Sequence, residues 1–298
     1  MDFENRLAEI TGAANVKAEE PMKNHTTFRI GGPAQFFVTP ENADELILVV
    51  GLCRGQEMPY TVIGNGSNLL VSDAGYRGVV ISTEKLDVCQ TEGERIRAGA
   101  GVKLARMAKQ ALEHGLTGLE FAAGIPGTVG GALVMNAGAY GSEMKNVLVN
   151  AVLLTKDGAV IRRTGEELEL GYRTSNIPAE GLTVLEAEFQ LQPGDKNEIL
   201  QVMNDLAAKR REKQPLEYPS AGSTFKRPEG YFAGKLIDDA GLRGFQVGGA
   251  QVSEKHCGFV INRDQATAAD VEELCRQVAE KVKEQFGVDL EMEIKRLG

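Results

Sequence analysis

The sequence predicts an α+β fold of two or three domains. The chain has 298 residues, whereas one domain usually takes about 100–200 residues. Short apolar runs end at glycine or proline and alternate with longer stretches whose apolar residues recur at helical spacing. No internal repeat and no low-complexity linker interrupts this order. We therefore expect three successive units at residues 1–85, 86–212 and 213–287, with residues 288–298 returning to the first unit.

The first unit has a β-α-β-β order after a short N-terminal helix. Asn42 is a favourable N-cap for its main helix, and Gly55 is a favourable stop. The expected elements are a helix at 2–14, a strand at 34–40, a helix at 42–55, and strands at 60–64 and 78–82.

The second unit is expected to combine a hairpin with two helices. Lys156, Asp157 and Gly158 supply the turn of the hairpin. The basic end "KRREK" of the last helix suits a helix C-terminus, where it is either simply solvated or functional. The expected elements are a helix at 103–115, the hairpin at 147–164, a strand at 183–193 and a helix at 197–214.

The third unit opens on the segment "PSAGSTFKRP", in which Ser223 is expected to lie in a Gly-Ser-Thr turn. The run "VGGAQVS" is expected to be a glycine break between elements. The other expected elements are a helix at 232–241, a strand at 258–262, a helix at 267–286 and a last short strand at 289–294.

The composition excludes several classes of protein. The net charge of −9 argues against sequence-independent binding to nucleic acid, which needs a basic surface. No apolar run reaches the roughly 18 residues of a membrane span, and the acidic start "MDFENRLAEI" does not resemble a signal peptide. We therefore expect a cytoplasmic protein with no membrane partner and no nucleic-acid partner.

The cysteines and histidines do not predict a metal site, because they are scattered and no cysteine pair has CxxC spacing. The absence of a GxSxG motif argues against a serine hydrolase. The cysteines are expected to be reduced thiols, with Cys257 in "KHCGF" as a minor alternative for a catalytic thiol.

Two glycine-rich segments are candidates for binding an anion. In "GNGSN" (Gly64–Asn68) the glycines let backbone N–H groups converge, although the motif is neither a Rossmann fingerprint nor a P-loop. The segment Gly124–Gly141 holds six glycines in 18 residues, which makes its backbone costly to order. Close approach of the main chain to a nucleotide-like cofactor explains both segments. The alternatives are a tight turn in the first segment and close packing of a strand against a helix in the second.

Five polar residues are candidates for chemistry, namely Arg173, Ser223, Lys226, Arg227 and Glu293. A serine hydroxyl is a poor acid, so Ser223 can donate a proton only to a strongly basic carbanion within hydrogen-bond reach. Lys226 and Arg227 suit a phosphate or a carboxylate. The alternative for all five is a turn or surface position, and their spacing does not decide between the two.

Seven motifs, in order along the chain, resemble the UDP-N-acetylenolpyruvoylglucosamine reductase (MurB) family. They are "IGNGSNLL", "GIPGTVGGA", "NAGAYG", "YRTS", "AGSTFKRP", "FAGKLIDDAGLRG" and "LEMEI". The resemblance runs from "NHTTFRIGGPA" at Asn24 to the C-terminus. The third unit has no inserted tyrosine-bearing loop near its start, which resembles the shorter, second type of the family.

The resemblance implies a two-part FAD-binding domain of the vanillyl-alcohol-oxidase (PCMH) type and a C-terminal α+β substrate-binding domain. FAD would be noncovalent, with its pyrophosphate in the two glycine-rich segments. The cofactor-binding residues implied are Ile63, Gly64, Asn65, Gly66, Ser67, Asn68, Gly124, Pro126, Gly127, Thr128, Gly130, Gly131, Ala132, Asn136, Ala137 and Gly138.

The resemblance also implies the reaction, which is NADPH-dependent reduction of UDP-N-acetylglucosamine enolpyruvate to UDP-N-acetylmuramate through FAD. This is a UDP-N-acetylmuramate dehydrogenase activity of peptidoglycan precursor synthesis, and hence of cell-wall biogenesis, cell shape and cell division. Ser223 matches the serine that gives a proton, Arg173 matches the arginine that polarises the substrate carboxylate, and Glu293 matches the C-terminal glutamate of the site.

The substrate-binding residues implied are Tyr172, Lys213, Lys226 and Arg227. Lys213 matches a family lysine only with a loop-length difference before Ser223, and Arg227 stands where one branch has asparagine. We expect a monomer with no metal.

Two other functions fit parts of the sequence. One is a different FAD enzyme of the same fold, such as an oxidase of sugars or lactones, but His25 and His114 lie outside the glycine-rich segments where a flavin anchor is expected. The other is a nucleotide-sugar binding module that has lost its activity. The presence of Arg173, Ser223 and Glu293 argues against it.

Overall fold

The computed structural model describes residues 2–298, which form two compact units. Of the described residues, unit 1 comprises 2–18, 36–65 and 78–210, and unit 2 comprises 19–35, 66–77 and 211–298. The chain therefore passes repeatedly from one unit to the other. The division into three parts expected from the sequence stays a prediction.

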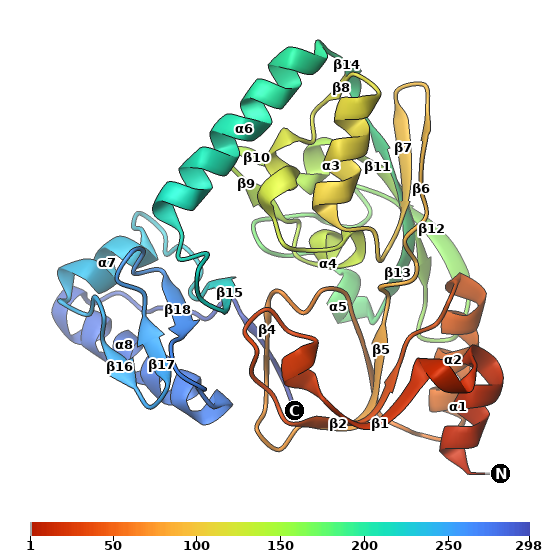
Figure 1. Cartoon of the computed structure of the whole chain (residues 1–298), viewed down its shortest axis with the longest axis horizontal. Helices are drawn as coiled ribbons and strands as arrows, with labels where there is room; N and C mark the ends of the chain where they lie inside the picture. Colours follow the sequence, from red (N-terminus) through yellow and green to blue (C-terminus); the bar gives the residue numbers. More distant parts are fainter. Residues whose placement is uncertain (1) are drawn as a thin grey trace. The chain divides into compact units, whose positions relative to one another are not determined.

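Unit 1 contains a five-stranded antiparallel sheet with the order β12-β11-β13-β7-β6. Its strands are β6 (Cys89–Glu92), β7 (Arg95–Gly99), β11 (Leu148–Leu154), β12 (Val160–Thr164) and β13 (Thr183–Gln190). The predicted hairpin at 147–164 is confirmed as β11 and β12. The helices α3 (Leu104–Glu113) and α4 (Val129–Val134) pack against this sheet (Figure 1).

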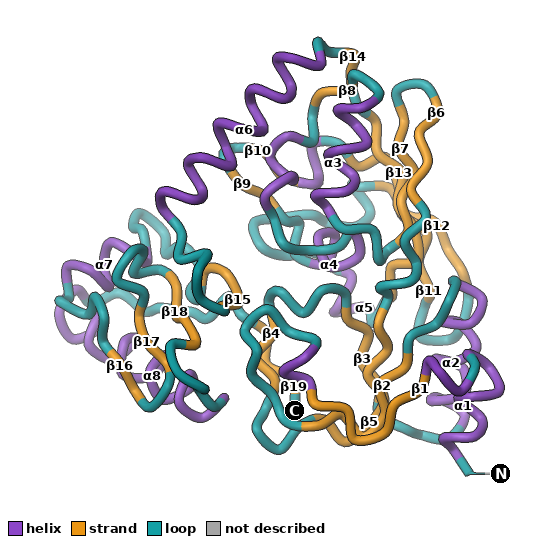
Figure 2. Tube along the Cα trace, in the orientation of Figure 1, coloured by secondary structure: helices purple, strands orange, loops and turns teal. Residues whose placement is uncertain are grey.

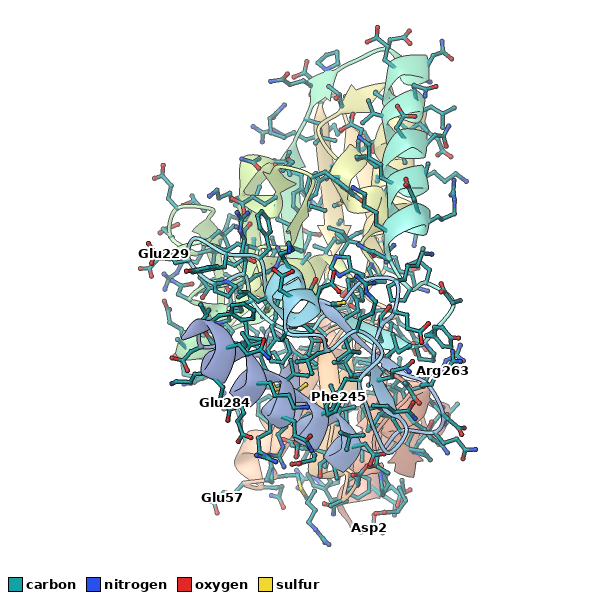
Figure 3. The ribbon with its side chains drawn as sticks, turned by 90° about the vertical axis from the view of Figure 1, so that its left-hand side faces the viewer. Asp2, Glu57, Glu229, Phe245, Arg263 and Glu284 are labelled. Carbon is teal, nitrogen blue, oxygen red and sulfur yellow. The ribbon has the colours of Figure 1, made fainter. Side chains whose placement is uncertain are left out.

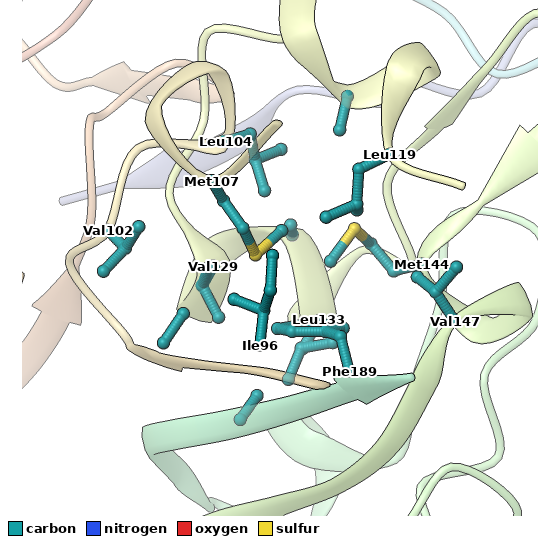
Figure 4. Close-up of a cluster of buried hydrophobic side chains, with 14 of the residues drawn as sticks. Ile96, Val102, Leu104, Met107, Leu119, Val129, Leu133, Met144, Val147 and Phe189 are labelled. Atoms are coloured by element: carbon teal, nitrogen blue, oxygen red, sulfur yellow. The ribbon is translucent and has the colours of Figure 1, made fainter. Parts of the chain in front are cut away.

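The core between these helices and the sheet is apolar and closely packed (Figure 4). Leu104 and Met107 of α3, Val129 and Leu133 of α4 and Phe189 of β13 are all fully buried. Full burial of each such side chain stabilises the fold by about 1.5–3 kcal/mol. The middle of the second glycine-rich segment, at Val129, Ala132 and Leu133, belongs to this core.

The other two long helices of this part of the chain accompany a four-stranded sheet of order β1-β2-β5-β3. Its strand β3 lies in unit 1, whereas β1, β2 and β5 are divided between the two units. Asn42 caps the second helix as predicted, because its side chain accepts a hydrogen bond from the Glu45 N–H at 3.0 Å. The elements are α1 (Phe3–Thr11), β1 (Val16–Pro21), β2 (Pro33–Val38), α2 (Ala43–Gly55), β3 (Tyr60–Ile63) and β5 (Tyr76–Ser82).

Unit 2 combines a second four-stranded sheet with two helices, shown in orange and purple in Figure 2. The sheet order is β15-β18-β17-β16, from β15 (Ser220–Ser223), β16 (Gln246–Val247), β17 (Ala250–Val252) and β18 (Phe259–Asn262). The helices are α7 (Ala233–Asp239) and α8 (Ala268–Phe286). Phe245 lies over α8 (Figure 3), where the Lys281 ammonium is 4.1 Å from its ring centroid.

Unit 2 draws on distant parts of the chain. Phe28, Ile30 and Leu70 are buried in the same core cluster as the side chains of α7 and α8. The strand β19 (Lys295–Leu297) pairs in parallel with β4 (Leu69–Val71), which directly follows the first glycine-rich segment. The last residues of the chain therefore complete a structure begun near residue 20.

Three sequence expectations about unit 2 were wrong. Ser223 ends strand β15 and does not lie in a simple turn. The run at 247–253 is no break, because Gly248 and Gly249 form the turn of the hairpin β16–β17. The last strand is Lys295–Leu297, and within 289–294 only Met292 forms a bridge, to Phe225.

The remaining elements are short apart from α6 (Lys196–Lys213), which corresponds to the helix expected at 197–214. They are β8 (Leu116–Thr117), β9 (Gly138–Ala139), β10 (Ser142–Glu143), α5 (Ile177–Glu180), β14 (Gln192–Pro193) and four 3₁₀ turns at 13–15, 22–24, 120–124 and 144–146. Among the described residues, no helix combines the length and the apolar character that a membrane span requires.

Candidate active site

The two glycine-rich segments meet within unit 1. The Asn65 side chain donates a hydrogen bond to the Pro126 carbonyl oxygen at 2.7 Å. A Cβ atom on Gly64 would lie 2.1 Å from Oγ1 of Thr128, far inside van der Waals contact. The end of β3 and the start of α4 therefore lie against each other, and glycine at position 64 is required for their approach.

The glycines of the second segment have two different roles. A Cβ on Gly130 would come within 3.1 Å of the Ala100 Cβ, and one on Gly138 within 2.6 Å of the Glu143 Cβ. These two glycines allow close packing, which is the alternative weighed for this segment. Gly131 is exposed and would meet only the Thr128 hydroxyl, at 3.8 Å. Space beside Gly131 is therefore open to a ligand.

The first segment presents a run of unpaired donors. Among the described residues, the backbone N–H groups of residues 64–68 meet no acceptor. Gly66 has a φ of 59°, a left-handed conformation that turns successive N–H groups toward one concave side. A Cβ at this position would also lie 2.1 Å from the His25 carbonyl oxygen. Five consecutive unpaired N–H groups suit an anionic group.

The start of α4 adds a further unpaired donor. Oγ1 of Thr128 is buried and has no hydrogen-bond partner in the described structure, which is uncommon for a buried hydroxyl. The N–H groups of Val129 and Gly130 are already used, because they donate to the carbonyl oxygens of Val102 and Ala100 at 2.9 Å each. The Thr128 hydroxyl and the open space at Gly131 therefore fit a phosphate-bearing cofactor such as FAD.

Other predicted cofactor residues have structural contacts. Ile63 and Ala132 are buried, and the Ala137 N–H donates to the Ala132 carbonyl oxygen at 2.8 Å. Gly124 lies beside Arg210 of α6, whose Cδ is 3.3 Å from a Cβ placed on this glycine. Burial lowers the pKa of Arg210, and the nearby Tyr140 acts in the opposite direction. The basic end of α6 is therefore not simply solvated at Arg210.

The loop that carries Arg173 is held by two of the predicted cofactor residues. The side chain of Asn136, fully buried, donates to the Gly171 carbonyl oxygen at 3.0 Å. The Arg173 guanidinium donates from Nη2 to the Gly138 carbonyl oxygen at 3.2 Å and lies 5.3 Å from the ring centroid of Tyr172. The "YRTS" loop is thus tied to the end of the second glycine-rich segment, and the exposed Tyr172 flanks the guanidinium.

Ser223 belongs to unit 2, where its neighbour Thr224 fixes the backbone. Thr224 is buried, its N–H donates to Gly258 at 2.8 Å, and its hydroxyl accepts from the Val260 N–H at 2.8 Å. Gly222 has a φ of 80°, and the pairing of β15 with β18 is irregular between Ser220 and Ser223. This bulge leaves the Ser223 side chain exposed on a rigid base.

Glu293 lies next to the Ser223 segment. Its N–H donates to the Thr224 carbonyl oxygen at 2.8 Å, and its side chain is largely buried, with 9% of the residue exposed. The Asn68 side chain donates to the Glu293 carbonyl oxygen at 3.2 Å. Unit 2 therefore brings together Ser223, Glu293 and the end of the first glycine-rich segment.

The predicted substrate-binding residues of unit 2 are all at the surface. Lys226 pairs with the exposed Glu291, and the Arg227 guanidinium lies 3.9 Å above the ring centroid of Phe232. Lys213 is exposed at the end of α6. These positions agree with contact to an anionic substrate and equally with simple solvation, so their roles stay predictions.

The alternative of a catalytic thiol at Cys257 does not fit its surroundings. Burial raises the pKa of Cys257 to about 11, so the thiol stays protonated near neutral pH. Its Sγ lies 3.6 Å from a carboxylate oxygen of Asp238, which disfavours a thiolate further.

Sequence reasoning missed Thr27 as a residue that shapes the site. Its N–H donates to the Gly66 carbonyl oxygen at 3.4 Å, and its hydroxyl donates to the Ser220 carbonyl oxygen at 2.7 Å. Thr27 thus joins the first glycine-rich segment to the strand that ends in Ser223. The only signal was the motif "NHTTFRIGGPA", which marked the start of the resemblance without assigning a role to this threonine.

Comparison with known proteins also supports a site for FAD. Residues 214–297 match the C-terminal domain of UDP-N-acetylenolpyruvoylglucosamine reductase, and residues 34–164 match an FAD binding domain. The reductase of that name from Agathobacter rectalis is 56% identical over 293 residues, which cover 94% of this chain and 93% of the relative. The one from Clostridium kluyveri is 50% identical and covers 100% of this chain and 98% of the relative.

Solved structures agree on the fold. The crystal structure of the reductase (MurB) from Thermus caldophilus has a TM-score of 0.81 at 39% identity, covering 95% of this chain and 98% of that chain. A grass pollen allergen with glucose dehydrogenase activity, Phl p 4, has a TM-score of 0.52 at 14% identity over 65% of this chain and 45% of its own, which supports the fold alone. The predicted α+β class with an FAD-binding domain is confirmed. The chain belongs to the UDP-N-acetylenolpyruvoylglucosamine reductase family of FAD-dependent oxidoreductases.

Proposed function

We propose that this protein reduces UDP-N-acetylglucosamine enolpyruvate to UDP-N-acetylmuramate with NADPH, as a step of peptidoglycan precursor synthesis. Noncovalent FAD, when bound, supplies the hydride chemistry between the two substrates. The observation that carries the proposal is the junction in unit 2 at which the Glu293 N–H donates to the carbonyl oxygen of Thr224, next to Ser223. This contact joins two of the three predicted catalytic residues across about 70 positions of sequence.

The glycine-rich segments hold the cofactor in this proposal. Backbone N–H groups of residues 64–68 and the hydroxyl of Thr128 are the donors for its pyrophosphate. Four other predicted cofactor residues are engaged within the protein, because Ile63 and Ala132 are buried and the Asn65 and Asn136 amides each donate to a carbonyl oxygen of the protein.

Arg173 stabilises negative charge on the substrate carboxylate in this proposal. Addition of hydride to the enolpyruvyl double bond leaves electron density next to the carboxylate, and a guanidinium favours that charge more strongly as it develops. The contact with the Gly138 carbonyl oxygen keeps the guanidinium oriented before the substrate binds.

Ser223 gives the proton in this proposal. The exposed hydroxyl stands on a backbone fixed by Thr224, so it can be aligned with a carbanion that is basic enough to take its proton. Glu293, buried beside the same strand, is the third member of the site.

The experiment that tests the function is anaerobic stopped-flow absorbance of the flavin band. The purified protein is first reduced with NADPH and then mixed with UDP-N-acetylglucosamine enolpyruvate. We expect rapid bleaching and then rapid recolouring. Bleaching without recolouring would leave the flavin but assign a different substrate, such as a sugar or a lactone. No flavin band after addition of FAD would contradict the cofactor.

The first prediction concerns Ser223→Ala in the same experiment. We expect bleaching by NADPH at nearly the wild-type rate and recolouring slowed on the order of 10²–10⁴-fold, the usual contribution of a general acid. The separate rates of bleaching and recolouring are measured. Equal slowing of both steps would contradict the role of Ser223 as the proton donor.

A further inference from the structure

The side chain of Asn68 is committed to the Glu293 segment. Its Nδ2 donates to the Glu293 carbonyl oxygen at 3.2 Å. The backbone carbonyl oxygen of Asn68 accepts a hydrogen bond from the Lys295 N–H at 2.9 Å. Because a backbone carbonyl can only accept, the amide of Asn68 must present its NH₂ group to Glu293. Asn68 therefore forms hydrogen bonds to the main chain at Glu293 and at Lys295, on either side of Ile294.

Glu293 depends on such contacts because it has little secondary structure of its own. Residues 289–294 form no strand, and regular pairing with β4 begins only at Lys295. On its other side the Glu293 N–H is held by the Thr224 carbonyl oxygen at 2.8 Å. The Glu293 backbone is thus fixed between the Ser223 strand and the first glycine-rich segment, with Asn68 supplying the side-chain contact.

We propose that Asn68 is a positioning residue that acts through the Glu293 backbone on the step in which Ser223 and Glu293 take part. This inference rests on the proposed function. It differs from the role predicted from the sequence, in which Asn68 binds the cofactor with its side chain. In the structure one of the two N–H donors of the side-chain amide is already used by the Glu293 carbonyl oxygen.

The test uses Asn68→Ala and Asn68→Asp in the full-length, FAD-loaded protein. Aspartate keeps the size of the side chain but can only accept when ionised, so it repels the Glu293 carbonyl oxygen. We expect recolouring by UDP-N-acetylglucosamine enolpyruvate to slow on the order of tenfold more than bleaching by NADPH, because small displacements of catalytic groups carry effects of this size. Aspartate should slow recolouring at least as much as alanine.

Asn262→Ala is the matched control. The Asn262 side chain also donates to a distant backbone carbonyl of unit 2, that of Phe28 at 3.1 Å, but it does not contact Glu293. Equal ratios of the two rates in Asn262→Ala and Asn68→Ala would overturn the inference, because the effect would then be a general loss of rigidity.

Amide hydrogen exchange gives a second readout that does not depend on turnover. We expect faster exchange in the peptide that covers Glu293 and Lys295 in Asn68→Ala, and wild-type exchange there in Asn262→Ala. Unchanged exchange in Asn68→Ala would overturn the inference. If wild-type protein is bleached but not recoloured by the substrate, the proposed function fails, while the exchange result still decides whether Asn68 positions Glu293.

Discussion

At the scale of single residues, the backbone of Arg173 has a φ of 53°, a left-handed conformation that is uncommon outside glycine. The contact of Asn136 with Gly171 and that of the guanidinium with Gly138 hold the loop in this form. Strain of this kind persists only where the surroundings impose it. The geometry supports a guanidinium that is oriented in advance, as the proposed role in binding a carboxylate requires.

The second prediction therefore compares Arg173→Lys with Arg173→Ala. Lysine keeps the charge but loses the planar, two-pronged donor group. We expect both variants to slow recolouring by the substrate strongly, with lysine retaining only a minor part of the activity, and to leave bleaching by NADPH nearly unchanged. Single-turnover rates of both steps provide the measurement. Wild-type recolouring in Arg173→Ala would remove this residue from the site.

At the scale of elements, the end of β3 and the start of α4 fix the two glycine-rich segments against each other. Gly64 and Thr128 are so close that no Cβ fits between them. Close packing and ligand binding are therefore not exclusive explanations of these glycines. The packing places Gly64 and Asn65 beside the second segment, and the backbone N–H groups of both residues have no acceptor among the described residues.

The third prediction is a double-mutant cycle between Gly64 and Thr128. Gly64→Ala should destabilise the protein by about 1–3 kcal/mol through overpacking and weaken FAD retention. In a Thr128→Ala background the same change should cost less, because the nearest remaining obstacle, the Thr128 Cβ, is 3.2 Å away. Thermal unfolding and FAD titration of the four proteins provide the measurement. Strictly additive effects would show that the two residues do not constrain each other.

Local signals were enough to predict many elements of the fold. Asn42 caps α2 because a capping side chain needs only the N–H groups that follow it. A strand was expected at 289–294, yet that segment lacks a ladder partner and pairing starts at Lys295. The strand partner, β4, is more than 200 residues earlier, and no local pattern specifies such a register.

Some features of the candidate site were likewise predictable from the sequence, and others depend on the folded structure. The unusual glycine content of 124–141 was visible in the sequence, whereas the assignment of Gly130 to packing and of Gly131 to open space depends on Ala100 and Thr128 in the folded unit. The positioning of Glu293 by Asn68 was not predictable, because a single hydrogen bond between distant residues has no signature in one sequence.

At the scale of the whole molecule, neither unit is a continuous piece of chain. Unit 2 takes its sheet and helices from residues 211–298 but includes Phe28, Ile30 and Leu70 in its core and β4 beside β19. The matched reductase C-terminal domain, at residues 214–297, is therefore only part of a folding unit in this protein.

The fourth prediction is that residues 211–298 do not fold cooperatively when expressed alone. The fragment would expose the apolar surface that Phe28, Ile30 and Leu70 cover, and it would leave β19 unpaired. Circular dichroism melts and the dispersion of backbone amide signals in NMR provide the measurement, with the full chain as the control. A sharp thermal transition together with dispersed signals would refute this expectation.

The parallel pair of β4 and β19 also has a consequence for the synthesis of the protein on the ribosome. β4 leaves the exit tunnel more than 200 residues before its partner β19. At about 5–20 residues per second, β4 waits for tens of seconds before Lys295 can reach it. During synthesis the nascent chain therefore carries an open strand edge next to the first glycine-rich segment, and unit 2 is not complete until β19 has been translated.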